Sequence, residues 1–95
     1  MGFKEAKRRL LTALKTGVFQ HAARSGRIED KNLLLMGQVT PQDVIGIVEK
    51  CNGTHHTASP LHSDPSIVVH VLKRSGWYIK FYVLEPDVWF ISVHR

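Results

Sequence analysis

Six side chains in the last third of the chain have the residue types that metal-free cleavage of RNA requires. Such cleavage needs a base that deprotonates the ribose 2′-hydroxyl, cations that stabilise the charge building on the phosphate, and an acid that protonates the leaving 5′-oxygen. Histidine titrates near neutral pH, lysine and arginine bind phosphate, and tyrosine stacks on bases or donates a proton. The six side chains are His70, Tyr78, Lys80, Tyr82, His94 and Arg95.

The same residues also have a purely structural interpretation. Tyr78 and Tyr82 could pack beneath a helix, His70 could be a hydrogen-bonded core histidine, and Lys80 could extend its ammonium group to solvent. Residue types alone favour this structural interpretation. The position of the side chains on the secondary structure must therefore decide between the two.

Residues 67–95 are expected to form three antiparallel strands. The runs are rich in β-branched and aromatic residues, and turn sequences separate them at residues 74–76 and 85–87. Because successive side chains of a strand point to opposite faces, each run splits into two rows. The rows predicted to form one apolar face are Trp77, Ile79, Phe81 and Val83 in the middle run and Trp89, Ile91 and Val93 in the last. The other, mixed face is predicted to carry His70, Tyr78, Lys80, Tyr82, Ser92 and His94.

Two helices are expected in the first half of the chain. Apolar residues recur at helical spacing over residues 3–16, and Gly17 is typical of a left-handed helix end. The pair Thr40-Pro41 is typical of a helix start, and residues 52–53, Asn-Gly, are typical of an end.

The remaining segments are less regular. Residues 18–20 could be a short extended piece, residues 21–24 and 29–36 could be helical, and residues 54–65 resemble a polar loop with at most one edge strand. We therefore predict one α+β domain over residues 1–95. Its antiparallel sheet would consist of the C-terminal three-stranded meander and possible short edge strands, packed against two to three helices.

The positive charge of the chain is concentrated near its N-terminus. The net charge is +5, and residues 1–27 hold seven basic residues against Glu5 alone, which is +6, so the rest of the chain sums to −1. A basic first quarter favours a polyanion or an acidic protein as partner. A solvated helix face would explain the same charges.

The cysteine content and the hydropathy predict a cytoplasmic protein without membrane contact. Cys51 has no second cysteine with which to form a disulfide, which fits a reducing compartment. No apolar run approaches the ~20 residues of a membrane span, and the N-terminus lacks the apolar core of a signal peptide.

Three histidines in the polar segment first suggest metal ligands. They are His55, His56 and His62. Zinc sites need defined spacing on rigid elements, and this cluster has neither a nearby cysteine nor a helical His-Glu-x-x-His frame. We therefore expect these three histidines to be polar loop residues, and we expect neither a metal ion nor a cofactor. Serine-centred nucleophile signatures and glycine-rich phosphate loops are also missing from the sequence.

Three stretches of the chain resemble the MqsR family of bacterial toxin ribonucleases, whose fold is RelE-like. They are residues 62–64 (His-Ser-Asp), 77–83 (Trp-Tyr-Ile-Lys-Phe-Tyr-Val) and 87–95 (Asp-Val-Trp-Phe-Ile-Ser-Val-His-Arg). The family has a Tyr-Ser-Asp turn, a strand with Tyr-Leu-Lys and a last strand ending Val-Ser-Phe-Lys at the corresponding places. The resemblance covers about residues 38–95, and the first third agrees only in the order of elements.

The resemblance implies roles for three residues of the meander. Tyr78 and Lys80 match the tyrosine and lysine of the family's penultimate strand, where the tyrosine is expected to contact RNA. His94 falls where the family has a functional lysine. A histidine there could bind phosphate or donate a proton. With His70, which is our candidate for a family glutamine without a clear match, these form the expected catalytic set.

The chain departs from the family pattern outside these strands. Residues 55–59 read His-His-Thr-Ala-Ser where the family has a Tyr-Lys-x-Met cluster, and the loop at residues 73–76 is shorter than in the family. Histidines 55 and 56 are thus candidates to replace the missing groups. The residues expected to bind substrate are His55, His56, Lys73, Arg74, Tyr82 and Arg95.

The function implied by the resemblance is that of a toxin in a type II toxin–antitoxin system. Such a toxin cleaves mRNA without a metal and arrests growth. A cognate antitoxin, encoded in the adjacent reading frame, would hold it inactive, and contact with the ribosome is possible. Two alternatives remain from the sequence. One is a non-catalytic RNA- or ribosome-binding module, and the other is an interaction domain that binds an acidic partner through the basic first helix.

Overall fold

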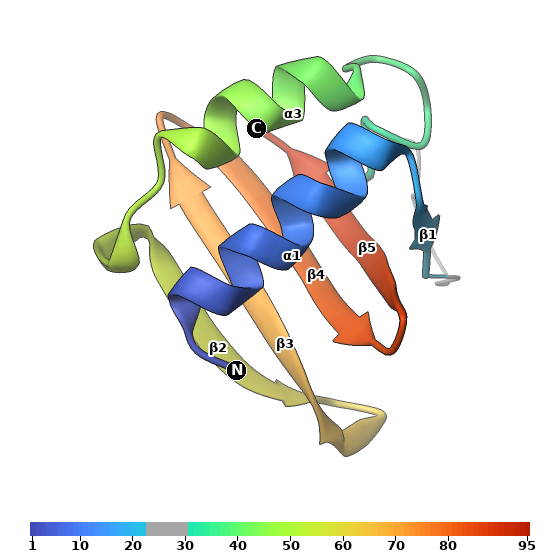
Figure 1. Cartoon of the computed structure of the whole chain (residues 1–95), viewed down its shortest axis with the longest axis vertical. Helices are drawn as coiled ribbons and strands as arrows, with labels where there is room; N and C mark the ends of the chain where they lie inside the picture. The colour runs from blue at the N-terminus through green and yellow to red at the C-terminus, as the bar shows by residue number, and fades with distance from the viewer. Residues whose placement is uncertain (23–30) are drawn as a thin grey trace.

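The computed structural model describes residues 1–22 and 31–95, which form a five-stranded mixed sheet with helices on one face (Figure 1). The expected α+β class and the C-terminal meander are confirmed. In chain order the elements are α1 (Phe3–Thr16), β1 (Phe19–His21), α3 (Pro41–Glu49), the 3-10 turn η1 (Gly53–His55), β2 (His56–Leu61), β3 (Asp64–Arg74), β4 (Trp77–Leu84) and β5 (Asp87–His94).

The sheet has the strand order β1-β5-β4-β3-β2. The four strands from β2 to β5 are antiparallel to their neighbours, whereas β1 pairs with β5 in parallel. The short extended piece expected at residues 18–20 is β1. The expected edge strand within residues 54–65 is β2, which continues through Pro60 on the outer edge, where proline is tolerated because it need not donate to a neighbour.

Helices α1 and α3 lie side by side on the same face of the sheet (Figure 1). The face of α1 that packs against the sheet is the predicted apolar stripe, and α1 ends at Gly17, whose φ of 76° suits a residue without a Cβ. Helix α3 begins with a capping box. The Asp43 N–H donates to Thr40 Oγ1 (3.1 Å), and the Thr40 N–H donates to Asp43 Oδ2 (2.9 Å).

Lys7 of α1 connects the two helices. Its ammonium group donates to the carbonyl oxygens of Glu49 (3.0 Å) and Cys51 (2.9 Å). These carbonyls lie at the C-terminal end of α3, where the last turn leaves acceptors unpaired and the helix dipole favours a cation. One basic residue of the first helix is therefore part of the fold.

The hydrophobic core lies between the two helices and the sheet. Burial of these apolar side chains is the main favourable term in folding. The sheet contributes Leu72, Ile79, Phe81, Val88, Phe90 and Val93, and the helices contribute Ala6, Leu10, Ala13, Leu14, Val44 and Val48.

Strand β5 contains a β-bulge that the alternation argument missed. Phe81 pairs with Phe90, but Lys80 pairs with Ser92, so Ile91 is an extra residue in β5. A bulge of this kind shifts the strand's two-residue alternation by one position. The predicted apolar row of Trp89, Ile91 and Val93 is therefore wrong. The row that faces the helices is Val88, Phe90 and Val93.

The helical pieces expected at residues 21–24 and 29–36 fall partly outside the described residues, since 23–30 are not described. His21 belongs to β1, Lys31 is helical, and residues 33–37 form turns. Asn32 makes a parallel bridge with Val93 beside these turns. None of the helices in residues 1–22 and 31–95 is long and apolar enough to cross a membrane.

Candidate functional site

The sheet face turned away from α1 and α3 carries half of the predicted site residues, namely Lys73, Tyr78, Lys80, Tyr82 and His94. We call it the open face. Directly paired residues of adjacent antiparallel strands point to the same side of a sheet, so the register determines its members. The pairs on this side are Lys73 with Tyr78, Tyr78 with His94, Lys80 with Ser92, and Tyr82 with Trp89.

Two ring pairs lie along the open face. The Tyr82 and Trp89 rings are nearly parallel, at 5° with centroids 6.2 Å apart, and the Tyr78 and His94 rings are inclined by 20° with centroids 5.0 Å apart. Lys80 lies between the two pairs along β4. The face thus presents flat aromatic surfaces on both sides of a cation.

The large side chains of the open face cover an apolar floor. Val69 pairs with Tyr82 and Val71 pairs with Lys80, and both valines are buried although α1 and α3 lie on the other side. The purely structural interpretation of Lys80 therefore holds in part. Its aliphatic stem packs over this apolar surface while its ammonium group can reach solvent. Burial also raises the pKa of the Tyr82 phenol.

The hydrogen bond of His94 defines which of its nitrogens can act as a base. Its Nδ1 lies 2.9 Å from the main-chain oxygen of Arg95. Because that oxygen can only accept, Nδ1 must be the donor. In the neutral ring the proton is then on Nδ1, and Nε2 has an unshared electron pair. Neutral His94 can therefore accept a proton at Nε2.

A cationic hollow of about 360 Å³ lies at the turn of the β3–β4 hairpin, beside Tyr78. Residues 73–78 line it, including Lys73 and Arg74. Lys73 Nζ lies 5.5 Å from the centre of the Tyr78 ring, and the Arg95 guanidinium lies 4.7 Å from that of Trp77. The structure therefore brings three of the predicted substrate-binding residues, Lys73, Arg74 and Arg95, to this end of the molecule.

His70 does not lie on the open face, so its predicted position is wrong. It pairs with Phe81, points toward the helices and is 2% exposed. Its Nδ1 is 2.9 Å from Nε2 of His56, and the rings of Phe3 and Phe81 flank the two imidazoles. Within residues 67–72 both rows of β3 are apolar apart from this histidine, so alternation could not show which row faces the core. A hydrogen-bonded partner makes the burial of His70 tolerable.

His55 and His56, the neighbouring histidines of the polar segment, also lie away from the open face. His56 is the partner of His70, and His55 Nδ1 accepts the Asn52 N–H (2.9 Å) as part of the η1 cap. Burial lowers the pKa of His56. It also lowers the pKa of His70, to which the charges of His56 and the N-terminal amine contribute further. The structure therefore does not bring these histidines together with Tyr78, Lys80 and His94.

The alternation argument missed Trp89, which lies on the open face. It placed Ser92 on that face correctly. The only signal for Trp89 would have been the bulge at Ile91, and no residue type marks a bulge of this kind. Within residues 1–22 and 31–95 no group of three or more His, Cys, Asp or Glu side chains could hold a metal ion.

Comparisons with known proteins give no independent identification. No protein-family model matches the chain, and searches of curated proteins and of solved structures find no match. Membership in the MqsR family therefore stays a prediction that rests on residues 62–95.

Proposed function

We propose that this chain is an endoribonuclease that binds single-stranded mRNA on the open face and cleaves it there without a metal ion. The observation that carries the proposal is the arrangement of two ring pairs, Tyr82–Trp89 and Tyr78–His94, on either side of Lys80. Aromatic rings that stack on bases, interleaved with cations that bind phosphate, are the usual means of binding single-stranded nucleic acid.

The spacing of the ring pairs favours a single strand over a duplex. Tyr78 and Tyr82 are four residues apart on one strand, or about 13 Å at ~3.3 Å per residue. Bases stacked in a helix repeat every ~3.4 Å, so bases bound at both ring pairs would be splayed apart. Splayed, unstacked bases are typical of protein recognition of single-stranded RNA. The phosphodiester between them would pass over Lys80.

The cleavage step follows from the groups around that phosphodiester. Nε2 of neutral His94 takes the proton of the ribose 2′-hydroxyl, and the 2′-oxygen attacks the phosphorus. The bond from phosphorus to the 5′-oxygen breaks, which leaves a 2′,3′-cyclic phosphate. The Lys80 ammonium stabilises the charge on the phosphate oxygens, and the Tyr78 hydroxyl donates a proton to the departing 5′-oxygen. The His94 imidazolium then releases its proton to solvent and the phenol regains one, which restores both groups.

The biological setting that we propose is the one implied by the resemblance. In it the fold is a RelE-like variant, the enzyme is the toxin of a type II toxin–antitoxin pair in the cytoplasm, and a protein encoded in the adjacent reading frame inhibits it. The α+β arrangement and the basic first quarter of the chain support this setting. Contact with the ribosome is part of the same proposal.

The direct test is incubation of the purified protein with unstructured RNA, with and without EDTA. We expect cleavage to products that end in a 2′,3′-cyclic phosphate, at a rate that EDTA does not change. Expression of the chain without its neighbour should arrest growth. Intact RNA under both conditions, together with normal growth on expression, would refute the proposal.

A second candidate function is RNA binding without cleavage. The observation that favours it is the position of His70, which leaves His94 as the only histidine on the part of the open face that the structure describes. Metal-free acid–base cleavage commonly uses two such groups, and a lone histidine beside a lysine also suits simple phosphate binding. Tight binding of an oligonucleotide that is recovered uncut would select this function.

A further inference from the structure

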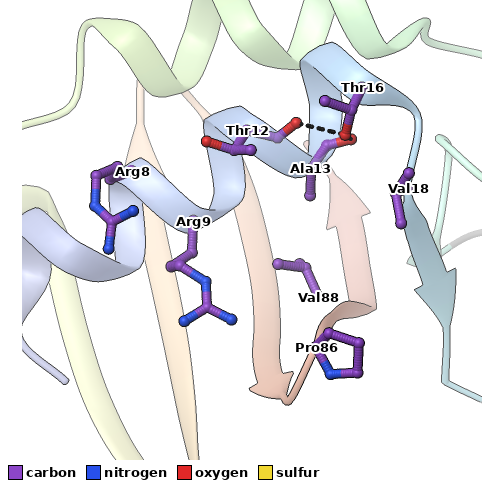
Figure 2. Close-up of a pocket in the computed structure, with 8 residues that line it drawn as sticks. All are labelled: Arg8, Arg9, Thr12, Ala13, Thr16, Val18, Pro86 and Val88. Carbon is purple, nitrogen blue, oxygen red and sulfur yellow. Dashed lines mark hydrogen bonds between the residues drawn. The ribbon is translucent and has the colours of Figure 1, made fainter.

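A hollow of about 280 Å³ lies beside α1, on the helix-covered side of the sheet (Figure 2). We call it the α1 pocket. It is bounded by α1, by the turn between β4 and β5, and by the residue that leads into β1. Its lining consists of Arg8, Arg9, Thr12, Ala13, Thr16, Val18, Pro86 and Val88.

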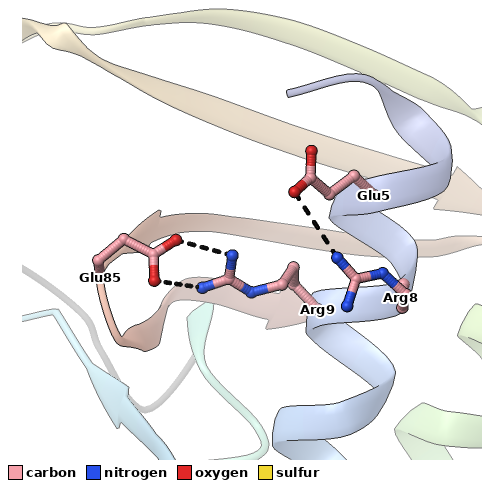
Figure 3. A network of polar contacts seen from close by, with 4 residues as sticks. All are labelled: Glu5, Arg8, Arg9 and Glu85. Carbon is pink, nitrogen blue, oxygen red and sulfur yellow. Dashed lines mark hydrogen bonds and ion pairs between the residues drawn. The ribbon is translucent and has the colours of Figure 1, made fainter.

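One arginine of the pocket already binds a carboxylate. Arg9 contacts both carboxylate oxygens of Glu85, at 2.7 and 2.8 Å (Figure 3). The side chain of Arg9 is 21% exposed and that of Glu85 is 70% exposed. The guanidinium is thus the anchored partner, and the carboxylate is the group that solvent or another molecule can reach. Two-point contact of this kind is the geometry in which arginine selects carboxylates.

The second arginine of the pocket is held much more loosely. Arg8 lies 3.6 Å from Glu5, which is longer than a hydrogen bond, and its side chain is 66% exposed (Figure 3). Exposed pairs of this sort contribute little to stability. Arg8 can therefore turn toward an anion in the pocket at small cost.

The opposite wall of the pocket is apolar. Val18 is 59% exposed, and Pro86 and the buried Val88 also line the pocket. Cations on one wall and aliphatic side chains on the other are complementary to a carboxylate next to an apolar group. A phosphodiester backbone has no apolar group to place against Val18.

We propose that the α1 pocket docks an acidic peptide segment of another protein, with one carboxylate on Arg8 and Arg9 and a neighbouring aliphatic side chain against Val18. The incoming carboxylate displaces Glu85 from Arg9, so Glu85 acts as an internal competitor. The volume suits one or two inserted side chains and is below the usual range for sites that enclose a small-molecule ligand. This interaction is separate from the RNA chemistry of the open face.

The test uses a short peptide of alternating glutamate and leucine as the probe, titrated into the ¹⁵N-labelled protein and followed by NMR. We expect saturable shifts of the amides around the pocket, above all those of Thr12, Thr16 and Val18. The same peptide with lysine in place of glutamate should leave them unchanged. So should a short oligouridylate, which is an anion without an aliphatic group.

Three variants and a matched control test the contacts. Arg8→Gln and Val18→Ser should each weaken peptide binding by a factor of ten or so, whereas Glu85→Gln should strengthen it several-fold because it frees Arg9. Lys50→Gln removes one positive charge from an exposed residue at the end of α3 and should have no effect. All four positions are partly or fully exposed, so the variants should fold.

Three results would overturn the proposal. The first is the absence of saturable shifts at millimolar peptide. The second is a peptide affinity that falls no more in Arg8→Gln than in Lys50→Gln, or that does not rise in Glu85→Gln. The third is an equal response to the oligouridylate, which would make the pocket a general polyanion surface. None of these results depends on whether the open face cleaves RNA.

Discussion

His94 is the residue on which the proposed chemistry depends most. It is half-buried at the end of β5, with its ring against Tyr78 and its Nδ1 bonded to the main chain. Replacing it with glutamine removes the titratable nitrogen and keeps a polar side chain of similar reach. We expect RNA cleavage to fall roughly 10²–10⁴-fold, the usual contribution of a general acid or base. The midpoint of thermal unfolding should change little, and RNA affinity should fall by no more than the loss of one stacking ring, about 1–3 kcal/mol. A large drop in that midpoint would show that His94 is structural.

Lys80 should contribute through charge. If it binds a phosphate, Lys80→Gln removes one counterion-releasing contact, and the slope of log affinity against log salt should become shallower by about 0.7 for a single strand. Fluorescence anisotropy with a labelled oligonucleotide at several salt concentrations measures this slope. Lys50→Gln serves as the control on the other side of the sheet, and an identical slope for both variants would exclude Lys80 from the binding surface.

The His56–His70 pair predicts how stability depends on pH. Burial lowers the pKa of both residues below the ordinary value of 6.5, so the unfolded chain binds protons more readily than the folded one. Their contribution to stability is complete above about pH 6.5 and is lost as the pH falls through the lower pKa of the folded state. The hydrogen bond between the rings also needs one unprotonated nitrogen.

We therefore expect the urea midpoint to fall between pH 7.5 and pH 5. His70→Leu should reduce this fall, although it lowers stability at pH 7.5 by removing the bond to His56. Some dependence should remain, because burial also lowers the pKa of His21. An unchanged pH dependence in His70→Leu would contradict the assignment.

At the scale of the elements, the bulge in β5 puts Trp89 on the same face of the sheet as His94. Trp89 belongs to the open face and Val88 to the core. Trp89→Ala should weaken RNA binding by about 1–3 kcal/mol, the usual effect of losing one stacking ring. Val88→Ala should instead lower the free energy of unfolding and leave RNA affinity nearly unchanged. Equal effects of the two variants on RNA binding would place the RNA elsewhere.

The sequence predicted most of the elements and only part of the site. Helical periodicity and capping residues predicted α1 and α3, since those signals are local. Tyr78, Lys80 and His94 fell on one face because alternation along β4 is unbroken and His94 lies beyond the bulge. The position of His70 depended on its pairing with His56, fourteen residues away in the sequence, and a long-range partner leaves no local signal.

At the scale of the whole molecule, the two proposed surfaces lie on opposite sides of one sheet. The open face carries the ring pairs, and the α1 pocket lies beside α1 on the other side. Figure 1 shows that α1 and α3 cover that other side. An acidic peptide in the pocket would therefore leave the RNA surface accessible. We expect the affinity for a labelled oligonucleotide to be the same with and without saturating peptide. A peptide that displaces the oligonucleotide would show that the two sites overlap.

The parallel pairing of β1 with β5 has a consequence for how the protein is made. Strand β5 lies between β1 and β4, so the sheet is continuous only once residues 87–94 have left the ribosome. Until then β1 has no neighbour, and α1 has no completed sheet to pack against. Contacts between such distant parts of a chain form late in folding, because the intervening chain must first lose conformational entropy. His94 belongs to this same strand, so a nascent chain would acquire its proposed base only as its sheet closes.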